Sequence, residues 1–140
     1  MVPELPEVIS VHVIPIMPDG KVVAVNVRSR GVDMPGGHVE ATDVSPLAAL
    51  TREVSEEARI DLAAPILIDV LEITGSMTVT RPQKYMLIYA ARVVAVREFV
   101  EGNEISERLF ISPADFSGRY FGSKEYADVI VRRAVETVGI

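Results

Sequence analysis

Residues 45–58 change from the strand-like patterns around them to a helical one, and this change constrains the fold most strongly. Ser45 is a favourable N-cap, and Pro46 falls at the first helical position, where proline is well tolerated. Four apolar residues then recur every three to four positions and share an arc of roughly 80° on an ideal helix: Leu47, Leu50, Val54 and Ala58. The helix therefore needs an apolar surface, such as a sheet, to cover that arc.

The segments around this helix are rich in β-forming residues. Segments 7–17 and 21–28 flank Pro18-Asp19-Gly20, which predicts a β-hairpin, and further strands are expected at about 66–80 and 84–97. A loop and a final helix from about Ser123 to Val138 follow. The apolar stripe of that helix is predicted to be Tyr126, Val129, Ile130 and Ala134. This order predicts an α/β fold in which helices enclose a mixed β-sheet, as one domain over residues 1–140.

Three glutamates occupy the helix beside its apolar arc. Glu53, Glu56 and Glu57 share an arc of roughly 100°, and their i, i+3 and i, i+4 spacing brings like charges together. A divalent cation such as Mg²⁺ would turn that repulsion into ligation by oxygen. The alternative is an ordinary solvated surface, with Arg52 and Arg59 offsetting the acids. The adjacent glycines Gly36 and Gly37, shortly before the helix, favour a site, because they let backbone approach an anionic ligand closely.

The stretch PGGHVEATDVSPLAALTREVSEEARI, residues 35–60, resembles the Nudix box of the MutT-like hydrolases. In that box a glycine, five residues, a glutamate and seven residues precede Arg-Glu-apolar-x-Glu-Glu-x-Gly-apolar. The residues that match its opening and its helical core are Gly36, Gly37, Val39, Glu40, Arg52, Glu53, Val54, Glu56, Glu57 and Ile60. The resemblance implies the Nudix α/β/α sandwich and a loop–helix–loop that binds Mg²⁺ and diphosphate.

The sequence departs from the box at two positions. Asp43 replaces the glutamate that follows the glycine, and eight residues rather than seven separate it from Arg52. Arg59 replaces the glycine after the paired glutamates, although a left-handed helix cap costs arginine more than glycine. These changes leave the predicted metal ligands in place and leave the role of Asp43 open.

The resemblance assigns roles to individual residues. Glu53, Glu56, Glu57 and the carbonyl of Gly37 would hold Mg²⁺, for which Mn²⁺ can substitute, and Arg52 would orient a glutamate. The general base would be Glu53 or Glu56 from the box, or a later-loop glutamate, Glu104 or Glu107, of which we favour Glu104. The substrate-binding candidates are Arg28, Arg30, Gly36, Gly37 and Glu40, with the two arginines clamping phosphate. We interpret His12 as structural and His38 as incidental.

Charge and composition exclude several classes of protein. The net charge of −6 provides no basic field for a nucleic acid polymer, and the absence of cysteine excludes thiolate chemistry and disulfides. Without a signal-peptide pattern or a membrane-length apolar run, we expect a cytoplasmic protein that does not bind membranes. The resemblance also makes a homodimer paired through sheet edges one arrangement to consider.

The substrate is predicted only as a class. We expect hydrolysis of a pyrophosphate bond in a small nucleotide-type compound. In the family that the sequence resembles, a proline shortly after the box marks members that cleave ADP-ribose, and a tyrosine marks those that cleave dinucleoside polyphosphates. Gly75 and Ser76 occupy that region here, so the resemblance leaves nucleoside triphosphates as the default by elimination. The alternatives are a catalytically weak Nudix-like nucleotide sensor and a non-Nudix protein with an acidic surface helix.

Overall fold

The structure is a computed structural model that describes residues 8–73 and 84–139. Its elements follow in the order β1 (Val8–Ile16), β2 (Val22–Val27), β3 (Gly31–Asp33), β4 (Gly36–His38), α1 (Pro46–Glu57), β5 (Ile60–Ile73), β6 (Lys84–Val96), β7 (Ile105–Ile111), α2 (Pro113–Arg119) and α3 (Lys124–Val138). Within the described ranges, no helix is long and apolar enough to cross a membrane.

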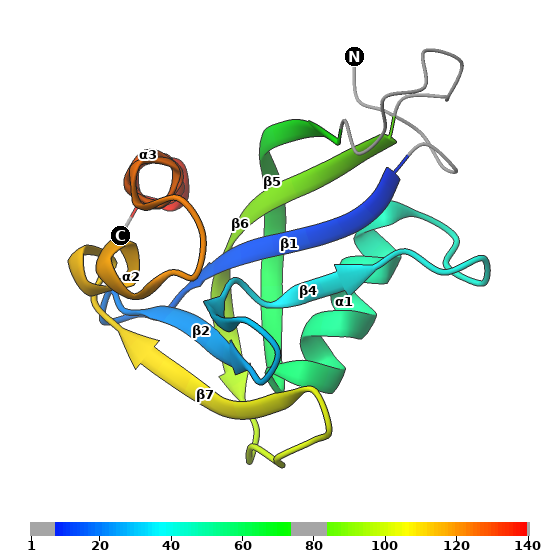
Figure 1. Cartoon of the computed structure of the whole chain (residues 1–140), viewed down its shortest axis with the longest axis horizontal. Helices are drawn as coiled ribbons and strands as arrows, with labels where there is room; N and C mark the ends of the chain where they lie inside the picture. The colour runs from blue at the N-terminus through cyan, green and yellow to red at the C-terminus, as the bar shows by residue number, and fades with distance from the viewer. Residues whose placement is uncertain (1–7, 74–83, 140) are drawn as a thin grey trace.

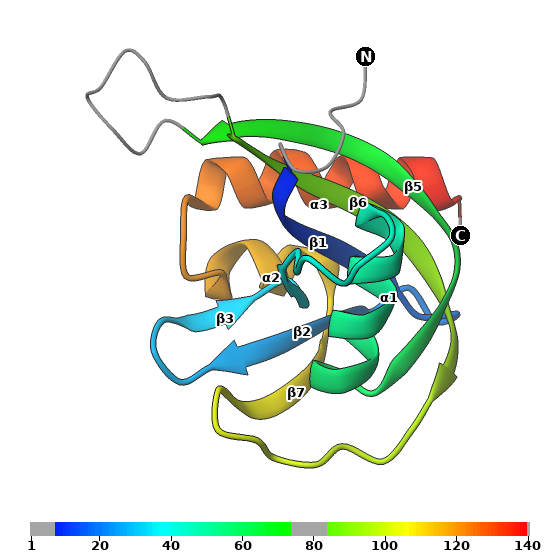
Figure 2. The same cartoon turned by 90° about the vertical axis from the view of Figure 1, so that its right-hand side faces the viewer.

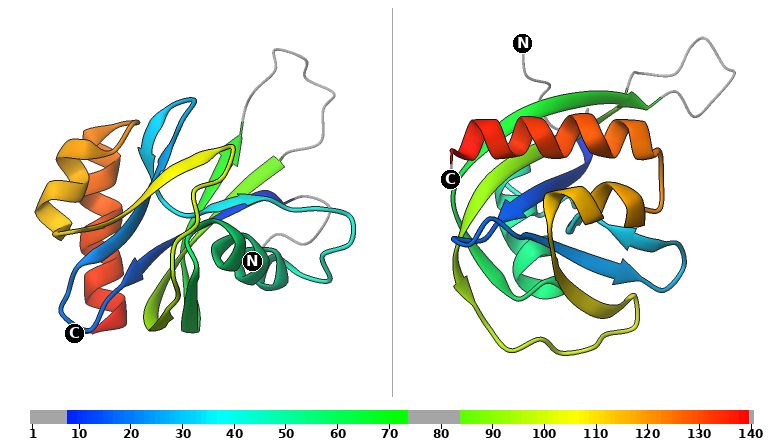
Figure 3. Two further views of the ribbon diagram at one scale, coloured as in Figure 1. Left: turned by 90° about the horizontal axis from the view of Figure 1, so that it is seen from below. Right: turned by 90° about the vertical axis from the view of Figure 1, so that its left-hand side faces the viewer.

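A mixed sheet lies between two helical layers. The main path of the sheet is β3-β2-β1-β6-β5, with β4 paired to β1 and β7 paired to β2. The β1–β6 pair is parallel, whereas the others are antiparallel. Helix α1 covers one face, and α2 and α3 cover the other (Figures 1 and 2). Figure 3 shows the same layers from below and from the α2–α3 side. The predicted α/β/α sandwich with a mixed sheet is confirmed.

Both faces of the central strands are buried, because each strand feeds alternate side chains into two cores. Val11 and Val13 of β1 join the core under α1, while Ile14 and Ile16 join the core under α2 and α3. In β6, Leu87 and Ile88 divide between the two cores in the same way. This arrangement explains why these segments read as nearly continuous apolar runs rather than as simple alternation.

Helix α1 begins as predicted, with the Ser45 side chain accepting a hydrogen bond from the Ala48 amide at 3.1 Å. Leu50, Val54 and Ala58 are buried, but Leu47 is 45% exposed, so its predicted place in the core is wrong. Ala49 is buried instead. The buried face is therefore rotated towards Ala49, because α1 packs against β4 as well as against β1 and β5. Glu53 follows Ala49 by four residues, so the rotation carries it towards the protein interior.

The C-terminal helix is confirmed, with Ser123 as its N-cap and Gly139 in the left-handed conformation at its end. Ile130 and Ala134 are buried as predicted, whereas Val129 is 49% exposed. Ala127 and Val131 are the further buried residues of α3. The buried stripe of α3 therefore includes Ala127 and Val131 in place of Val129, and the prediction missed this because it did not count the small Ala127 as a core residue.

Several strand predictions need correction. The predicted hairpin is confirmed, since β1 and β2 pair antiparallel with Ile16 opposite Val22, but the paired stretch is short because β1 goes on to pair with β4, and β2 with β3. Strand β5 begins at Ile60 rather than 66, since an irregularity between Ala63 and Ile66 interrupts its pattern; residues 74–80 of the predicted strand lie outside the described residues. The predicted loop contains β7 and α2. Strand β7 was not predicted because Glu107 and Arg108 interrupt its apolar pattern.

Two arginines, Arg59 and Arg108, lie at the C-terminal end of α1. Arg59 adopts a left-handed conformation with φ of 56°, and its Nε is buried without a hydrogen-bond partner. The Arg108 guanidinium, reaching across from β7, donates to the carbonyls of Ala58 at 2.9 Å and Arg97 at 2.6 Å. Arg108 thus satisfies the Ala58 carbonyl, one of those that a helix end leaves without internal partners, and ties the end of α1 to the segment after β6.

Arg59→Gly is expected to raise the free energy of unfolding by roughly 1 kcal/mol. Glycine takes the left-handed conformation without the steric cost paid by a residue with a Cβ, and part of that gain is offset by its freer unfolded chain. Urea denaturation measures the change. Arg59→Ala is the matched control, because it removes the side chain but keeps the backbone cost. A stabilisation equally large in the alanine variant would assign the gain to the buried Nε instead.

Candidate active site

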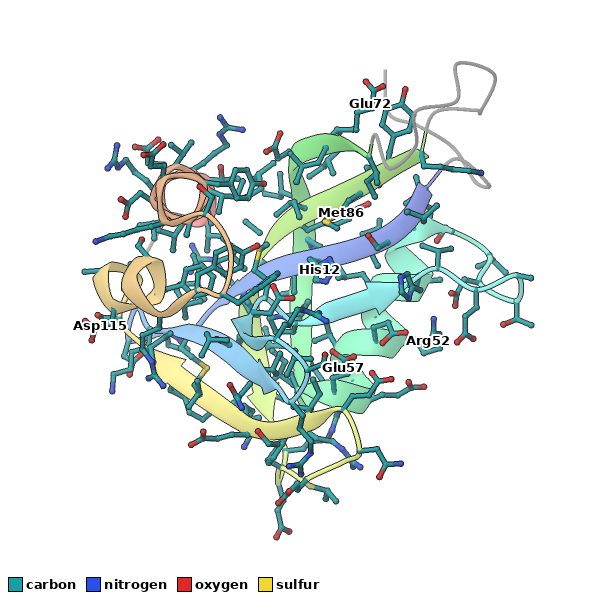
Figure 4. All side chains as sticks on the ribbon, in the orientation of Figure 1. His12, Arg52, Glu57, Glu72, Met86 and Asp115 are labelled. Atoms are coloured by element: carbon teal, nitrogen blue, oxygen red, sulfur yellow. The ribbon has the colours of Figure 1, made fainter. Side chains whose placement is uncertain are left out.

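A cleft of about 600 Å³ opens where β1, β4, α1 and the loop before β7 meet. Its walls are formed by His12, Val27, Arg28, Ser29, Arg30, Gly36, Gly37, His38, Glu40, Glu53, Glu57, Asn103 and Glu104. The cleft therefore gathers most of the residues that the sequence singled out, although they come from five separate segments. Figure 4 shows His12 and Glu57 in the central part of the molecule, with Arg52 also on α1.

Both glycines before α1 are required by close approach. At Gly36, with φ of 151°, an added Cβ would lie 2.1 Å from the Val11 carbonyl oxygen. At Gly37, an added Cβ would lie 2.5 Å from a carboxylate oxygen of Glu53. Any larger residue at these positions would displace β1 or the glutamate. The first glycine thus places β4 against the sheet, and the second makes room for the Glu53 carboxylate.

Glu53 and Glu57 form the acidic floor of the cleft. Burial raises the pKa of both carboxyl groups, and for Glu57 the neighbouring Glu53 charge adds to the effect and brings the pKa to about 8. The Gly36 amide, 3.5 Å from Glu57 Oε2, opposes this shift. At neutral pH the pair holds a proton, and a cation binding there would have to displace it.

Asp43, whose role the sequence left open, holds Arg52 in place. Its carboxylate accepts from Arg52 Nε at 3.0 Å and Nη2 at 2.9 Å, and also from the Glu40 amide at 2.8 Å. These hydrogen bonds lower the pKa of Asp43. The Asp43 amide in turn donates to the Glu40 carbonyl at 3.0 Å, so the extra loop residue is absorbed in a turn. The shorter aspartate reaches Arg52 from this turn.

Arg52 then reaches the glutamates. Its Nη1 lies 2.9 Å from Glu53 Oε1 and 3.6 Å from Glu56 Oε2, and its Nη2 donates to the His38 carbonyl at 3.2 Å. Glu40 is farther away, 3.8 Å from Nη1, with its side chain 60% exposed. Arg52 therefore holds the Glu53 carboxylate, which lies close to Gly37, and this supports the predicted orienting role of Arg52.

The loop before β7 brings Glu104 to the cleft. The Arg28 amide donates to the Glu104 carbonyl at 2.9 Å, which ties this loop to the end of β2. The Arg28 guanidinium pairs with Glu101, and both side chains are well exposed. Glu107 lies farther along on β7, opposite Asn26, and does not line the cleft. Of the two later-loop glutamates, only Glu104 is therefore placed near the carboxyl pair.

His12, Ser29 and Asn103 also line the cleft, although the sequence analysis did not assign them to the site. His12 is 8% exposed and burial lowers its pKa, so it is neutral. One signal was available in the sequence, because His12 is the ionisable residue of β1, a strand whose other residues are apolar apart from Ser10.

The acidic floor offers carboxylate oxygens, which are the ligands that a hard divalent cation prefers, so its donor chemistry fits such a cation. At neutral pH the two carboxylates share a proton. The third predicted ligand, Glu56, is turned towards Arg52 with its side chain 62% exposed. Over residues 8–73 and 84–139, no group of three or more His, Asp or Glu side chains is arranged to hold a metal ion. A third carboxylate ligand would require Glu56 to leave an exposed ion pair, which costs little.

The comparisons with known proteins identify the class. The family model of the NUDIX domain matches residues 6–133 of this chain. The chain therefore belongs to the Nudix hydrolase family. A search of curated proteins found no match.

Similar folds occur in solved structures with different activities. A UDP-X diphosphatase is 17% identical with a TM-score of 0.69, and the match covers 97% of this chain but 64% of that one, less than two thirds of its length. A Bacillus subtilis pyrophosphohydrolase is 19% identical, with a TM-score of 0.71 and coverages of 94% and 80%. A MutT structure, from a comparison of the proteins of Aliivibrio salmonicida and Vibrio cholerae, is 21% identical with a TM-score of 0.63. The match covers 93% of this chain and 98% of that one. At these identities the likeness establishes the fold and leaves the substrate open.

The raised pKa of Glu57 predicts how stability changes with pH. Below the ordinary value of 4.5 the group is protonated in both states, and above about 8 it is ionised in both. Between these values the folded state holds a proton that the unfolded state releases, so this group lowers the free energy of unfolding as pH rises. Urea denaturation in EDTA across this range should show a steeper fall for the wild type than for Glu57→Gln. Parallel curves would contradict the buried, protonated Glu57.

Proposed function

We propose that this chain hydrolyses a pyrophosphate bond in a nucleoside diphosphate-linked compound, with nucleoside triphosphates as the first candidates. The observation that carries the proposal is the cleft itself, in which the half-buried Glu53–Glu57 pair lies in one cavity with Arg28 and Arg30. Acidic groups that attract cations and guanidinium groups that attract phosphate oxygens are the two kinds of contact a metal-bound pyrophosphate needs.

Mg²⁺, or Mn²⁺ in its place, would be held by Glu53, Glu57 and Glu56 once Glu56 turns inward, with the Gly37 carbonyl as a further oxygen ligand. Bound there, the ion would neutralise phosphate oxygens and lower the pKa of a water. Arg52, held by Asp43, keeps the Glu53 carboxylate against Gly37. Glu104 borders the same cavity and is the group that would take a proton from the attacking water.

Arg28 and Arg30 would bind the phosphates. Arg28 is engaged with Glu101, but an exposed ion pair contributes about 0–1 kcal/mol, so a phosphate can replace the glutamate at little cost. Arg30 keeps two hydrogen bonds to Asp33 and lines the cleft beside Arg28. Two guanidinium groups in one cavity suit a chain of several phosphates, which supports triphosphates as first candidates.

A second function is favoured by one observation. Glu56 is turned away from Glu53 and Glu57, and the described part of the chain holds no ready group of three acidic ligands. A domain that binds a nucleotide without efficient hydrolysis would have the same cleft.

The experiment that separates the two is a panel of nucleoside triphosphates, damaged nucleotides, nucleotide sugars and dinucleoside polyphosphates, each with and without Mg²⁺ or Mn²⁺. Release of phosphate or pyrophosphate and binding are both measured. Metal-dependent cleavage of one class supports the hydrolase and identifies its substrate. Nucleotide binding with no cleavage across the panel supports the binding domain instead.

A further inference from the structure

The segment that joins β6 to β7, residues 97–104, carries Glu104 to the cleft, and we call it the Glu104 loop. It runs below the C-terminal end of α1 (Figure 2), and the two border a cavity of about 130 Å³ whose lining includes Glu56, Glu57 and Glu104. The structure describes all of residues 97–104 and places no helix or strand in them. Contacts with other segments must therefore fix where Glu104 lies relative to the acidic helix.

Arg108, on β7, makes contacts that join this loop to α1. Its Nη1 donates to the Arg97 carbonyl, at the start of the loop, at 2.6 Å, and to the Ala58 carbonyl, at the C-cap of α1, at 2.9 Å. The Arg59 carbonyl accepts from the same nitrogen at 3.3 Å. One guanidinium thus gathers carbonyls from the helix end and from the loop, and it stands on the strand that directly follows Glu104.

The guanidinium of Arg108 is itself held by aromatic rings. Its Cζ lies 5.7 Å from the centre of the Phe99 ring, in the loop, and 5.2 Å from that of the Phe110 ring, on β7. Arg108 is half-buried, and burial lowers its pKa, although an arginine stays charged near neutral pH. A planar cation with several donors can bind carbonyls at its edge while its faces contact rings, which a lysine ammonium cannot do.

Other hydrogen bonds carry this placement along the loop. At its start, the Arg97 amide donates to the Arg59 carbonyl at 2.8 Å, and the exposed Arg97 side chain pairs with Asp61. At its end, the Arg28 amide donates to the Glu104 carbonyl at 2.9 Å. The loop is thus tied to the end of α1 on one side and to the end of β2 on the other.

We propose that Arg108 is a positioning residue, which holds the end of α1 and the Glu104 loop together and so fixes Glu104 relative to the Glu53–Glu57 pair. Arg108 does not line the cleft, so it would act through Glu104 rather than on the substrate. The inference rests on the proposed function in taking Glu104 as the group that accepts a proton from the attacking water. That transfer requires hydrogen-bond reach, so a small displacement of the loop would slow it.

A double-variant cycle tests the proposal on whichever compound of the substrate panel is cleaved. Arg108→Met is expected to lower kcat by roughly ten- to a hundredfold and to change KM by less than about twofold, because the phosphate-binding residues keep their places. In a Glu104→Gln background the same change should have almost no further effect on kcat, since the group that Arg108 positions is already lost. An equal factor in both backgrounds is what a merely structural arginine would give, and it would overturn the proposal.

Arg92→Met is the matched control. Arg92 donates to the carbonyls of Val138 at 2.7 Å and Gly139 at 2.6 Å, so it closes the end of α3 as Arg108 closes the end of α1, but on the other face of the sheet. Its loss should lower resistance to urea and leave kcat near that of the wild type. A fall in kcat as large as that in Arg108→Met would assign the effect to lost stability and overturn the proposal.

Arg108→Lys is the second variant, used if Arg108→Met does not fold. It keeps the charge and can reach one carbonyl, but it cannot join several carbonyls as the guanidinium does. We expect its kcat to fall by about fivefold or more, again only when Glu104 is present. Wild-type kcat in a folded Arg108→Lys or Arg108→Met protein would contradict the positioning role.

Amide hydrogen exchange tests the same contacts without substrate or metal ion. In Arg108→Met the amides of Arg97 and Arg28 should exchange about tenfold faster than in the wild type, while those within α3 keep their rates. Unchanged exchange at both amides would overturn the proposal whatever the activity. If no compound of the panel is cleaved, the proposed hydrolysis fails, and faster exchange confined to this region would still support Arg108 as the residue that holds the loop.

Discussion

Glu57→Gln is expected to lower metal-dependent turnover by roughly two or more orders of magnitude, because it removes a carboxylate from the pair that would ligate the cation. The sequence placed this residue beside the apolar arc of the helix, and in the structure it is half-buried beside Glu53, where burial and the Glu53 charge raise its pKa to about 8. The neutral amide has almost the same shape and carries no charge into this site. The variant should therefore fold at least as stably as the wild type when no metal is present. Turnover and melting temperature, measured together, check both expectations.

Glu107→Gln is the matched control for this change. Glu107 is an exposed glutamate on β7 that does not line the cleft. The same substitution there removes a carboxylate outside the cleft, so turnover should remain near that of the wild type. Full activity in Glu57→Gln would refute the proposed metal site. An equal loss in both variants would point to a general charge effect instead.

Leu50→Ala is expected to reduce the free energy of unfolding by about 2–5 kcal/mol, the range typical of emptying a well-packed site. The Leu50 side chain is fully buried between α1 and the sheet. Its loss leaves a cavity under the helix that carries Glu53 and Glu57. Urea denaturation at fixed pH measures the change.

Leu47→Ala provides the comparison within the same helix. Leu47 is 45% exposed, so the same truncation there should change the free energy of unfolding by less than about 0.5 kcal/mol. If Leu47→Ala destabilised the protein as much as Leu50→Ala, α1 would be rotated relative to the orientation described above.

Part of the site could be predicted because it depends on spacing within one helix and its preceding loop. Gly36, Gly37, Arg52, Glu53 and Glu57 meet as expected, since helix geometry and close backbone approach act over a few residues. Glu104 was predicted as a later-loop candidate, and the structure places it in the cleft. Local periodicity could not have shown this, because the contact depends on a backbone hydrogen bond to Arg28 across the sheet.

Other features escaped the sequence because tertiary packing decides them. Wheel geometry alone assigned Leu47 to the core, but contact with β4 as well as β1 and β5 rotates the buried face towards Ala49. Strand β7 was missed because polar residues interrupt its apolar pattern, and pairing with β2 supplies the hydrogen bonds that make it a strand.

The sequence by itself therefore determined the class of fold, the acidic helix and the need for close backbone approach at the two glycines before it, because these follow from periodicity and short-range sterics. Only the tertiary structure decided that Asp43 holds Arg52, that Glu56 faces outward, and that His12 lines the cleft. Each of those outcomes depends on which distant segments share a surface. That choice is made by the packing of both faces of one sheet rather than by any local pattern.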